Sequence, residues 1–438
     1  YWVCEESTMK VKLIAIAIII LAGVIVLFIK AESFVSVNDE YDTYLASARA
    51  NAENQVPYMA VQKYRQAMNI KSDDEGVYKE YLEQTRLLGD SFYDAALKSY
   101  VVRFPQSAEA YERLCSYYYD NEEYQNVINL ANTAKDAGAA TEKVRNYYIE
   151  CIYKYKYVKM NLEGATTFLG NYAMVKSDGQ YGYITDSGSY LIAPAFEDAN
   201  VFISSSTAVN DGTEWYIINT DGFKIARPSE KVEKLSFSSD GKIRVAKNGK
   251  YGYTDAAFDI ADTLPYDYAT NFKNGVAAVK KGDKWTLIDS GENMITDYVY
   301  EDILLDEYET CIDNGVIFAK TGGKYYMTDK TGSQISSQGF DNAYPFAGTE
   351  PAAVCIGGKW GFADANGNIV IEPAYTAAKS FSIGLAPVQE NGKWVYINSN
   401  KDIRVNEQFD DALPFASNGI AAVKENGVWN YIKLLCYY

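Results

Sequence analysis

The sequence predicts a multidomain α + β protein: a transmembrane helix, then a region of α-hairpins, then a C-terminal all-β repeat array. Three observations support this prediction. Residues 13–29 are apolar throughout. From about Asp39 to Tyr157, apolar residues follow the 3.6-residue period of amphipathic helices. Between Tyr181 and Trp429 one short phrase occurs eight times at nearly constant spacing, which indicates an array of one supersecondary unit.

The apolar segment at residues 13–29 predicts an uncleaved membrane anchor. Its 17 residues lie at the lower end of the roughly 17–25 that span a bilayer. A signal peptide would have a shorter apolar core and a small-residue cleavage site, and none follows this segment. Lysines precede the segment and acidic residues follow it, so we expect residues 1–12 in the cytoplasm and the bulk of the chain outside the cell membrane. We expect the natural start at Met9, with residues 1–8 as an extension.

Residues 35–160 repeat one helical design about three times. Small residues at Ala60, Ala96 and Ala131 would allow paired helices to approach closely. The segment resembles tetratricopeptide (TPR) repeats, in which Ala, Tyr and a terminal Pro mark the second helix of each pair. Only Phe104-Pro105 keeps that proline, and the Trp and Gly-Tyr signature of the first helix is missing. The resemblance implies three helical hairpins that could offer a peptide-binding groove, and the alternative is an ordinary helical bundle or stalk.

The eight-fold phrase consists of a polar or basic residue, then Trp or Tyr, then a mostly apolar strand. The intervals between successive aromatic residues are 34, 36, 34, 40, 35, 34 and 35 residues. We take these aromatic residues as the structural signature of the repeat: Tyr181, Trp215, Tyr251, Trp285, Tyr325, Trp360, Trp394 and Trp429.

Each repeat predicts a small antiparallel meander. An Asp/Asn-Gly turn such as Asp364-Ala365-Asn366-Gly367 follows the aromatic strand, because these residues tolerate the backbone angles of tight turns. A β-branched strand, an acidic corner and a third strand come next. A meander this small cannot bury its apolar face by itself, and neighbouring meanders must therefore stack on one another. We favour radial stacking into a β-propeller over an open β-solenoid or superhelix. The last copy lacks a third segment, so a propeller would need the N-terminal end to complete it.

The best-preserved unit, Gly358 to Val388, begins Gly-Lys-Trp-Gly-Phe-Ala-Asp-Ala-Asn-Gly and ends Phe-Ser-Ile-Gly-Leu-Ala-Pro-Val. It resembles the bacterial WG repeat family over residues 168–432, as a domain of eight repeats. The glycine after the aromatic residue survives in only three copies: Tyr181-Gly182, Tyr251-Gly252 and Trp360-Gly361. The resemblance implies a binding or scaffolding role and no enzymatic activity.

Composition excludes several classes of function. The chain has no histidine, which removes Ser-His and Cys-His nucleophiles and His-ligated zinc. A net charge of −17 argues against nucleic-acid binding. The six cysteines show no regular spacing, so we expect isolated apolar core positions rather than disulfides or a metal site.

The repeated side chains are better explained by structure than by catalysis. The aromatic series could stack on sugar rings, but its period equals the structural repeat, which favours core packing. The corner acids (Glu197-Asp198, Glu301-Asp302, Asp410-Asp411) could form a carboxylate pair for glycoside hydrolysis, but they recur at the same place in several copies. The Asp-x-Asn-Gly turns lack the bidentate Glu of a calcium loop. We therefore predict no catalytic residue, metal or cofactor.

The predicted function is that of a membrane-anchored, extracytoplasmic, non-catalytic scaffold. It would bind protein partners through its TPR-like helices and WG repeats. The alternative is a cell-envelope carbohydrate-binding protein or glycan hydrolase. We expect the ligand where the copies differ, above all in the 40-residue interval between Trp285 and Tyr325 with its acidic insert, residues 301–307.

Overall fold

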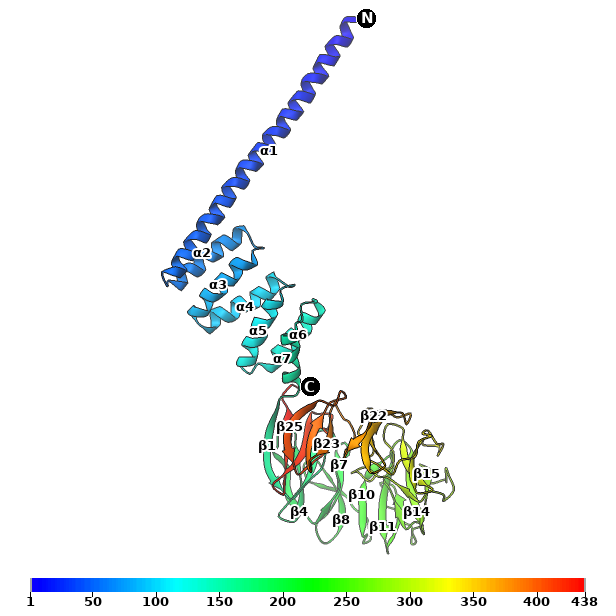
Figure 1. The fold of residues 1–438 in the computed structure, drawn as a ribbon. Coiled ribbons are helices and arrows are strands. Elements are labelled where there is room, and N and C mark those ends of the chain that lie inside the picture. The colour runs from blue at the N-terminus through cyan, green and yellow to red at the C-terminus, as the bar shows by residue number, and fades with distance from the viewer. Residues whose placement is uncertain (1, 437–438) are drawn as a thin grey trace. The chain divides into compact units, whose positions relative to one another are not determined.

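The computed structural model describes residues 2–436, apart from the side chains of residues 2–18, 28–36, 237 and 238. The chain divides into two compact units, one ending at Ile152 and the other beginning at Tyr153. The first unit is helical and the second consists of β-strands (Figure 1). Each unit is described separately below.

The predicted anchor lies within the long helix α1 (Trp2–Glu53). Among the residues with described side chains, no helix is long and apolar enough to cross a membrane. The anchor prediction for residues 13–29 falls partly on side chains outside the described set, and it stays a prediction.

Short helices follow α1, and each packs against the next along the chain (Figure 1). Asp74 and Ser107 cap α3 and α5, because their side chains accept hydrogen bonds from the backbone N–H groups of Val77 (3.1 Å) and Ala110 (3.3 Å). Pro57 opens α2, where its missing N–H costs nothing. The helices are α2 (Pro57–Ile70), α3 (Glu75–Leu88), α4 (Asp90–Arg103), α5 (Ala108–Asp120), α6 (Tyr124–Asp136) and α7 (Glu142–Ile152).

The core of the helical unit contains small residues and tyrosines. Ala60, Ala96 and Ala131 are all buried. The rings of Tyr78 and Tyr100 stack with centroids 5.2 Å apart, and the Tyr100 hydroxyl donates to Glu75 at 2.6 Å. Alanines beside large rings give the interlocking surface that antiparallel helices need. The relation to TPR repeats remains a resemblance.

The predicted helical region of residues 35–160 extends too far. The last helix ends at Ile152, and β1 (Tyr155–Leu162) follows it. Tyrosines and lysines alternate from Tyr153 to Tyr157, a two-residue period typical of a strand.

Over the described residues of the β unit, the strands form eight small antiparallel sheets in chain order. The first has β2 (Gly164–Ala165), β3 (Tyr172–Ser177), β4 (Gln180–Thr185) and β5 (Tyr190–Phe196). The second has β6 (Asp198–Ala199), β7 (Ser206–Asn210), β8 (Trp215–Asn219) and β9 (Lys224–Ala226). The third has β10 (Lys234–Ser239), β11 (Lys242–Lys247) and β12 (Lys250–Thr254), and the fourth has β13 (Tyr268–Ala269), β14 (Val276–Lys281) and β15 (Lys284–Asp289).

The other four sheets follow the same plan. The fifth has β16 (Asp302–Ile303), β17 (Ile317–Thr321) and β18 (Lys324–Thr328). The sixth has β19 (Asn342–Ala343), β20 (Ala352–Ile356), β21 (Lys359–Ala363) and β22 (Ile369–Tyr375). The seventh has β23 (Ala386–Glu390), β24 (Lys393–Ile397) and β25 (Ile403–Phe409), and the eighth has β26 (Asp411–Ala412), β27 (Ile420–Glu425), β28 (Val428–Leu434) and β1.

Strand β1 closes the array, because it pairs with the last strand, β28, although it precedes the first sheet in the chain. Tyr155 lies opposite Leu434 and Leu162 opposite Trp429. In Figure 1 the blue-green strand β1 accordingly lies beside the orange and red C-terminal strands. The N-terminal end of the β unit therefore completes the last blade, as a propeller requires.

Eight hydrophobic clusters fill the spaces between neighbouring sheets. One of them joins the first sheet to the eighth through Phe168 and Val175 on one side and Ala422 and Tyr431 on the other. The sheets thus form a closed, propeller-like ring, and the alternative of an open solenoid is wrong.

The sequence repeat and the sheet do not coincide. The unit from Gly358 to Val388 gives β21 and β22 to the sixth sheet but β23 to the seventh. The prediction of one meander per repeat is therefore wrong, because the chain changes sheet at the corner before the third strand of the repeat. Each repeat links two neighbouring blades covalently.

The glycine after the repeated aromatic residue permits a close approach by the next strand. A Cβ atom at Gly361 would lie 2.4 Å from the backbone oxygen of Ile371, and one at Gly182 would lie 2.6 Å from the nitrogen of Pro194. At Gly252 the nearest atom is the end of the Leu264 side chain, at 2.8 Å. The Trp-Gly phrase is thus a packing requirement where backbone crosses the glycine.

Candidate recognition site at the inner face of the ring

The eight repeated aromatic residues are distributed around the ring. Each lies in, or packs against, a hydrophobic cluster between two sheets, so the structure does not bring them together into one site. Those that are buried are Trp215, Trp285, Tyr325 and Trp394. Those that are half-buried are Tyr181, Tyr251, Trp360 and Trp429. Their positions match a structural role in the blades.

In several blades, the lysine of the repeated phrase forms an ion pair with the acid at the corner of the same repeat. Lys324 forms an ion pair with Asp341, and the second carboxylate oxygen of Asp341 accepts the Gly357 N–H at 2.6 Å. The hydrogen bond from Lys324, followed by that from Gly357, lowers the pKa of Asp341. The same arrangement recurs in other blades: Lys250, Asp267 and Gly282; Lys393, Asp410 and Gly427. These corner acids hold hairpins in place.

Most of the cysteines lie in the interior, as expected of apolar core positions. Of the five that the structure describes, four are buried: Cys115, Cys151, Cys311 and Cys355. Within the described part of the chain, no group of three or more His, Cys, Asp or Glu side chains is placed to hold a metal ion.

A cavity of about 430 Å³ lies where loops from several blades meet. These loops connect a two-residue strand with the next strand, as β2 connects with β3 and β16 with β17. The cavity takes Thr167 from the first sheet and Glu307 from the fifth. Sheets so far apart around a closed ring can meet only at its axis. The cavity therefore opens on the inner, axial face of the ring.

The acidic insert forms one side of this cavity. Asp306 accepts hydrogen bonds from the backbone N–H groups of Tyr308 (3.0 Å) and Thr310 (2.8 Å), which fold the loop into a tight turn. The ammonium of Lys273 lies 3.5 Å from a carboxylate oxygen of Asp306 and 3.1 Å from one of Asp313, so the two carboxylates share its single positive charge. Burial raises the pKa of Asp306, and hydrogen bonds from Thr310 partly oppose this.

Glu307 extends from the insert across the ring. Its Oε2 atom accepts the backbone N–H of Thr167 at 3.0 Å. No lysine or arginine among the described side chains forms an ion pair with Glu307 (the nearby Lys273 serves the two aspartates). Burial raises the pKa of Glu307, and hydrogen bonding from Thr167 offsets this only in part. The cavity thus contains one carboxylate without a counter-ion.

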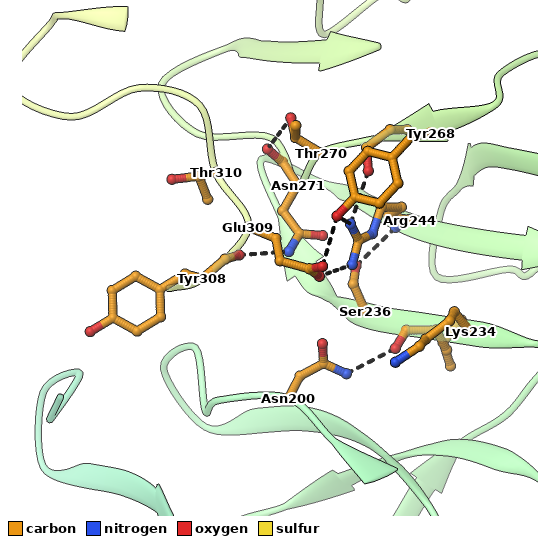
Figure 2. Close-up of polar contacts among 12 residues, drawn as sticks. Asn200, Lys234, Ser236, Arg244, Tyr268, Thr270, Asn271, Tyr308, Glu309 and Thr310 are labelled. Atoms are coloured by element: carbon orange, nitrogen blue, oxygen red, sulfur yellow. Dashed lines mark hydrogen bonds and ion pairs between the residues drawn. The ribbon is translucent and has the colours of Figure 1, made fainter. Parts of the chain in front are cut away.

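Beside the cavity, a buried arginine holds the insert to the third and fourth sheets. Figure 2 shows Arg244 directed at Glu309, with the ring of Tyr308 pointing away. The Arg244 guanidinium donates to Glu309 and also to the backbone oxygen of Ala269 at 2.9 Å. The Tyr268 hydroxyl donates to Glu309 at 2.8 Å. Burial would raise the pKa of Glu309, but the charge of Arg244 and the hydrogen bonds from Arg244 and Tyr268 together outweigh it and lower that pKa.

Asn271 completes this connection. Its side-chain N–H donates to the backbone oxygen of Tyr308 at 2.9 Å (Figure 2). Its backbone N–H donates to the backbone oxygen of Glu309 at 2.8 Å. The loop after β13 therefore fixes the insert in position next to the cavity.

The sequence predicted part of this site. The insert is the segment at the cavity, but Glu301 and Asp302 are engaged elsewhere: Glu301 accepts the N–H groups of the hairpin at Gly322 and Gly323, and Asp302 accepts the Tyr325 hydroxyl at 2.5 Å. Sequence reasoning missed Arg244. The signal was present, because the equivalent positions of the other blades are apolar: Met174, Ala208, Ala278, Phe318, Ala353, Pro387 and Ala422.

Comparison with known protein families identifies repeats in the β unit. The family described as "WG containing repeat" matches residues 266–285, 360–394 and 396–429. The chain therefore carries WG repeats in these segments. No curated protein sequence matches the chain.

Several solved structures show a distant similarity in shape. A crystal structure of the eukaryotic initiation factor aligns with 11% identity and a TM-score of 0.40, over 62% of this chain and 83% of that one. Kluyveromyces lactis Hsv2 aligns with 11% identity and a TM-score of 0.35, over 63% of this chain and 97% of that one. The WD40 domain of Neurospora crassa Pan2 aligns with 11% identity and a TM-score of 0.33, over 62% and 88%. Similarity at this level indicates no function.

Proposed function

We propose that this protein is a non-catalytic scaffold, anchored in the cell membrane, that binds a protein partner at the inner face of its ring. One observation carries the proposal. The residues that recur in every repeat build the blades, whereas residues that occur once, such as Arg244 and the insert at 305–309, gather beside one cavity. The other blades form without such residues, and their presence at one place supports a role in recognition beside their role in stability.

The sequence supports the remaining parts of the proposal. The apolar segment at residues 13–29 and the lysines before it favour a single-pass anchor with the bulk of the chain outside the membrane. The helical unit would supply a second interaction surface, since it exposes several large apolar side chains: Tyr58, Met59, Leu87, Phe92 and Val102.

The alternative of a glycan-binding protein or hydrolase has weaker support. The repeated aromatic residues pack between sheets rather than forming an open platform. The corner acids have structural partners, as Asp198 has in Lys234 (2.6 Å) and Asp411 in Lys379 (2.7 Å). A hydrolase would need two carboxyl groups free to act on a sugar.

Site-specific photo-crosslinking on membranes tests the proposal. A crosslinking residue at Ser417, which is exposed and lines the cavity, should capture a defined protein partner. A crosslinking residue at Glu390 should not, because Glu390 is exposed at the opposite end of its strand from the cavity side. Equal capture at both positions, or none at Ser417, would refute recognition at this face.

A further inference from the structure

The cavity at the inner face contains an acidic side chain that has no basic partner within the described part of the chain, unlike the carboxylates around it. Three neighbouring carboxylates have a cationic partner: Asp306 and Asp313 share Lys273, and Glu309 pairs with Arg244. Glu307 lines the cavity without such a partner among the described residues. Glu307 is also exposed to solvent, so a cation that enters the cavity can reach its carboxylate and pair with it.

Aromatic rings form much of the cavity wall. The lining includes Phe168, Tyr308, Tyr344, Phe346 and Phe415, from the first, fifth, sixth and eighth sheets. The faces of such rings attract organic cations, and they also bury the alkyl chain that carries the charge. The cavity volume of about 430 Å³ is within the usual range for small-ligand sites.

A buried hydroxyl group points to the same ligand. Thr167 is only 9% exposed, and its Oγ1 atom makes no hydrogen bond of good geometry among the described residues, although it lies close enough to Glu307 to lower the pKa of that carboxyl. Thr167 lines the cavity, and its backbone N–H already binds Glu307. A donor with several N–H groups, bound at Glu307, would satisfy this oxygen as well.

A metal ion fits less well than an organic cation. Calcium and magnesium need six or more oxygen ligands, and the oxygens of Asp306 already accept hydrogen bonds from its own loop.

We propose that this cavity binds a primary alkylammonium group, which pairs with Glu307 and lies among the aromatic rings. The inference rests on the proposed function and names the chemistry that the inner face recognises. The group can belong to a free diamine or to a lysine side chain of a protein partner, and the two sources share the same contacts.

Titration calorimetry on the full chain tests the inference with two probes. One is 1,5-diaminopentane, and the other is a short peptide that contains one lysine and has both termini blocked. At least one probe should bind, and the stronger probe indicates the source. Glu307→Gln should weaken binding about ten-fold or more, because the ion pair is lost while the amide oxygen can still accept the Thr167 N–H. Glu372→Gln, at an exposed carboxylate in β22, is the matched control and should bind as the parent chain does.

A second variant separates loss of the ion pair from loss of the fold. Tyr344→Leu keeps Glu307 and removes one ring, so it should weaken binding while the melting temperature stays close to that of the parent. No binding of either probe, or equal binding by the Glu307→Gln chain, would overturn the inference. In that case, a Ser417 crosslink that persists in the Glu307→Gln chain would show that the proposed function survives without the ammonium site. The absence of any Ser417 crosslink in the chain with Glu307 intact would refute the proposed function itself.

Discussion

The guanidinium group of Arg244, in the third sheet, donates a hydrogen bond to the carboxylate of Glu309, in the fifth. Only 5% of the arginine side chain is exposed, whereas 44% of the glutamate is. The Tyr268 hydroxyl from the intervening fourth sheet donates to the same carboxylate. Burial raises the pKa of Tyr268 to about 12, so the phenol keeps its proton. One ion pair thus connects three blades.

We expect Glu309→Gln to destabilise the β unit by about 3 kcal/mol, because it leaves Arg244 buried without its counter-charge. The double variant Arg244→Met/Glu309→Gln should recover most of this loss, since methionine suits an apolar site. Urea unfolding followed by tryptophan fluorescence measures both, because every tryptophan except Trp2 lies in the β unit. A double variant no more stable than Glu309→Gln would contradict this account.

Leu162 tests the closure of the ring. It is fully buried on β1, in the cluster between the eighth and first sheets. Leu162→Ala should cost about 2–4 kcal/mol of stability and make the last blade the first to open. Lys156→Ala, at an exposed position of the same strand, should change stability by less than about 0.5 kcal/mol. Chemical unfolding gives the cost, and hydrogen exchange of the β28 amides locates the opening.

The glycines of the repeated phrase should differ in tolerance. Gly361→Ala should destabilise by about 1–3 kcal/mol, because the new methyl group meets the backbone of Ile371 and Pro373. Gly252→Ala should cost clearly less, since the Leu264 side chain can rotate away. Thermal unfolding of the two variants makes the comparison, and equal losses would show that backbone contact does not explain the glycine.

The pH dependence of stability should reveal Glu307. Its pKa is raised in the folded protein, so the folded state binds the proton more tightly and Glu307 lowers stability as pH rises through that window. Glu307→Gln removes this penalty, and the variant should therefore be more stable than the parent near pH 7 and equal to it below about pH 4. Urea unfolding at several pH values measures the difference. Glu309, whose pKa is lowered, should show the opposite sign: its contribution is present at neutral pH and is lost as the pH falls.

The sequence predicted the ring because its signals are local and repeated. Aromatic strands recur at Tyr181, Trp360 and Trp394 with the spacing of a blade, and an Asp/Asn-Gly turn or an acidic corner follows each of them. Periodicity cannot show where one sheet ends, however. The change of sheet at the acidic corner depends on strand pairing, as between Asp411 and Lys424.

The parts of the fold that the sequence did not predict depend on distant or single residues. β1 shows the two-residue period of a strand, but nothing local predicts that it pairs with Trp429 at the other end of the β unit. Arg244 and Glu309 each occur once, and nothing local connects them. The position of the insert between Trp285 and Tyr325 could be predicted from its length, but its crossing to Thr167 follows only from closure of the ring.

The pairing of β1 with β28 also determines how the ring responds to force. Tyr155 and Leu434 lie opposite each other in an antiparallel pair, so the two ends of the β unit emerge at the same end of the pair. Tension between these ends therefore loads one hydrogen-bonded pair at a time and peels the strands apart, instead of loading all the pairs together. Because the remaining blades are linked covalently in series, the peeling of β1 would open the ring at one defined seam.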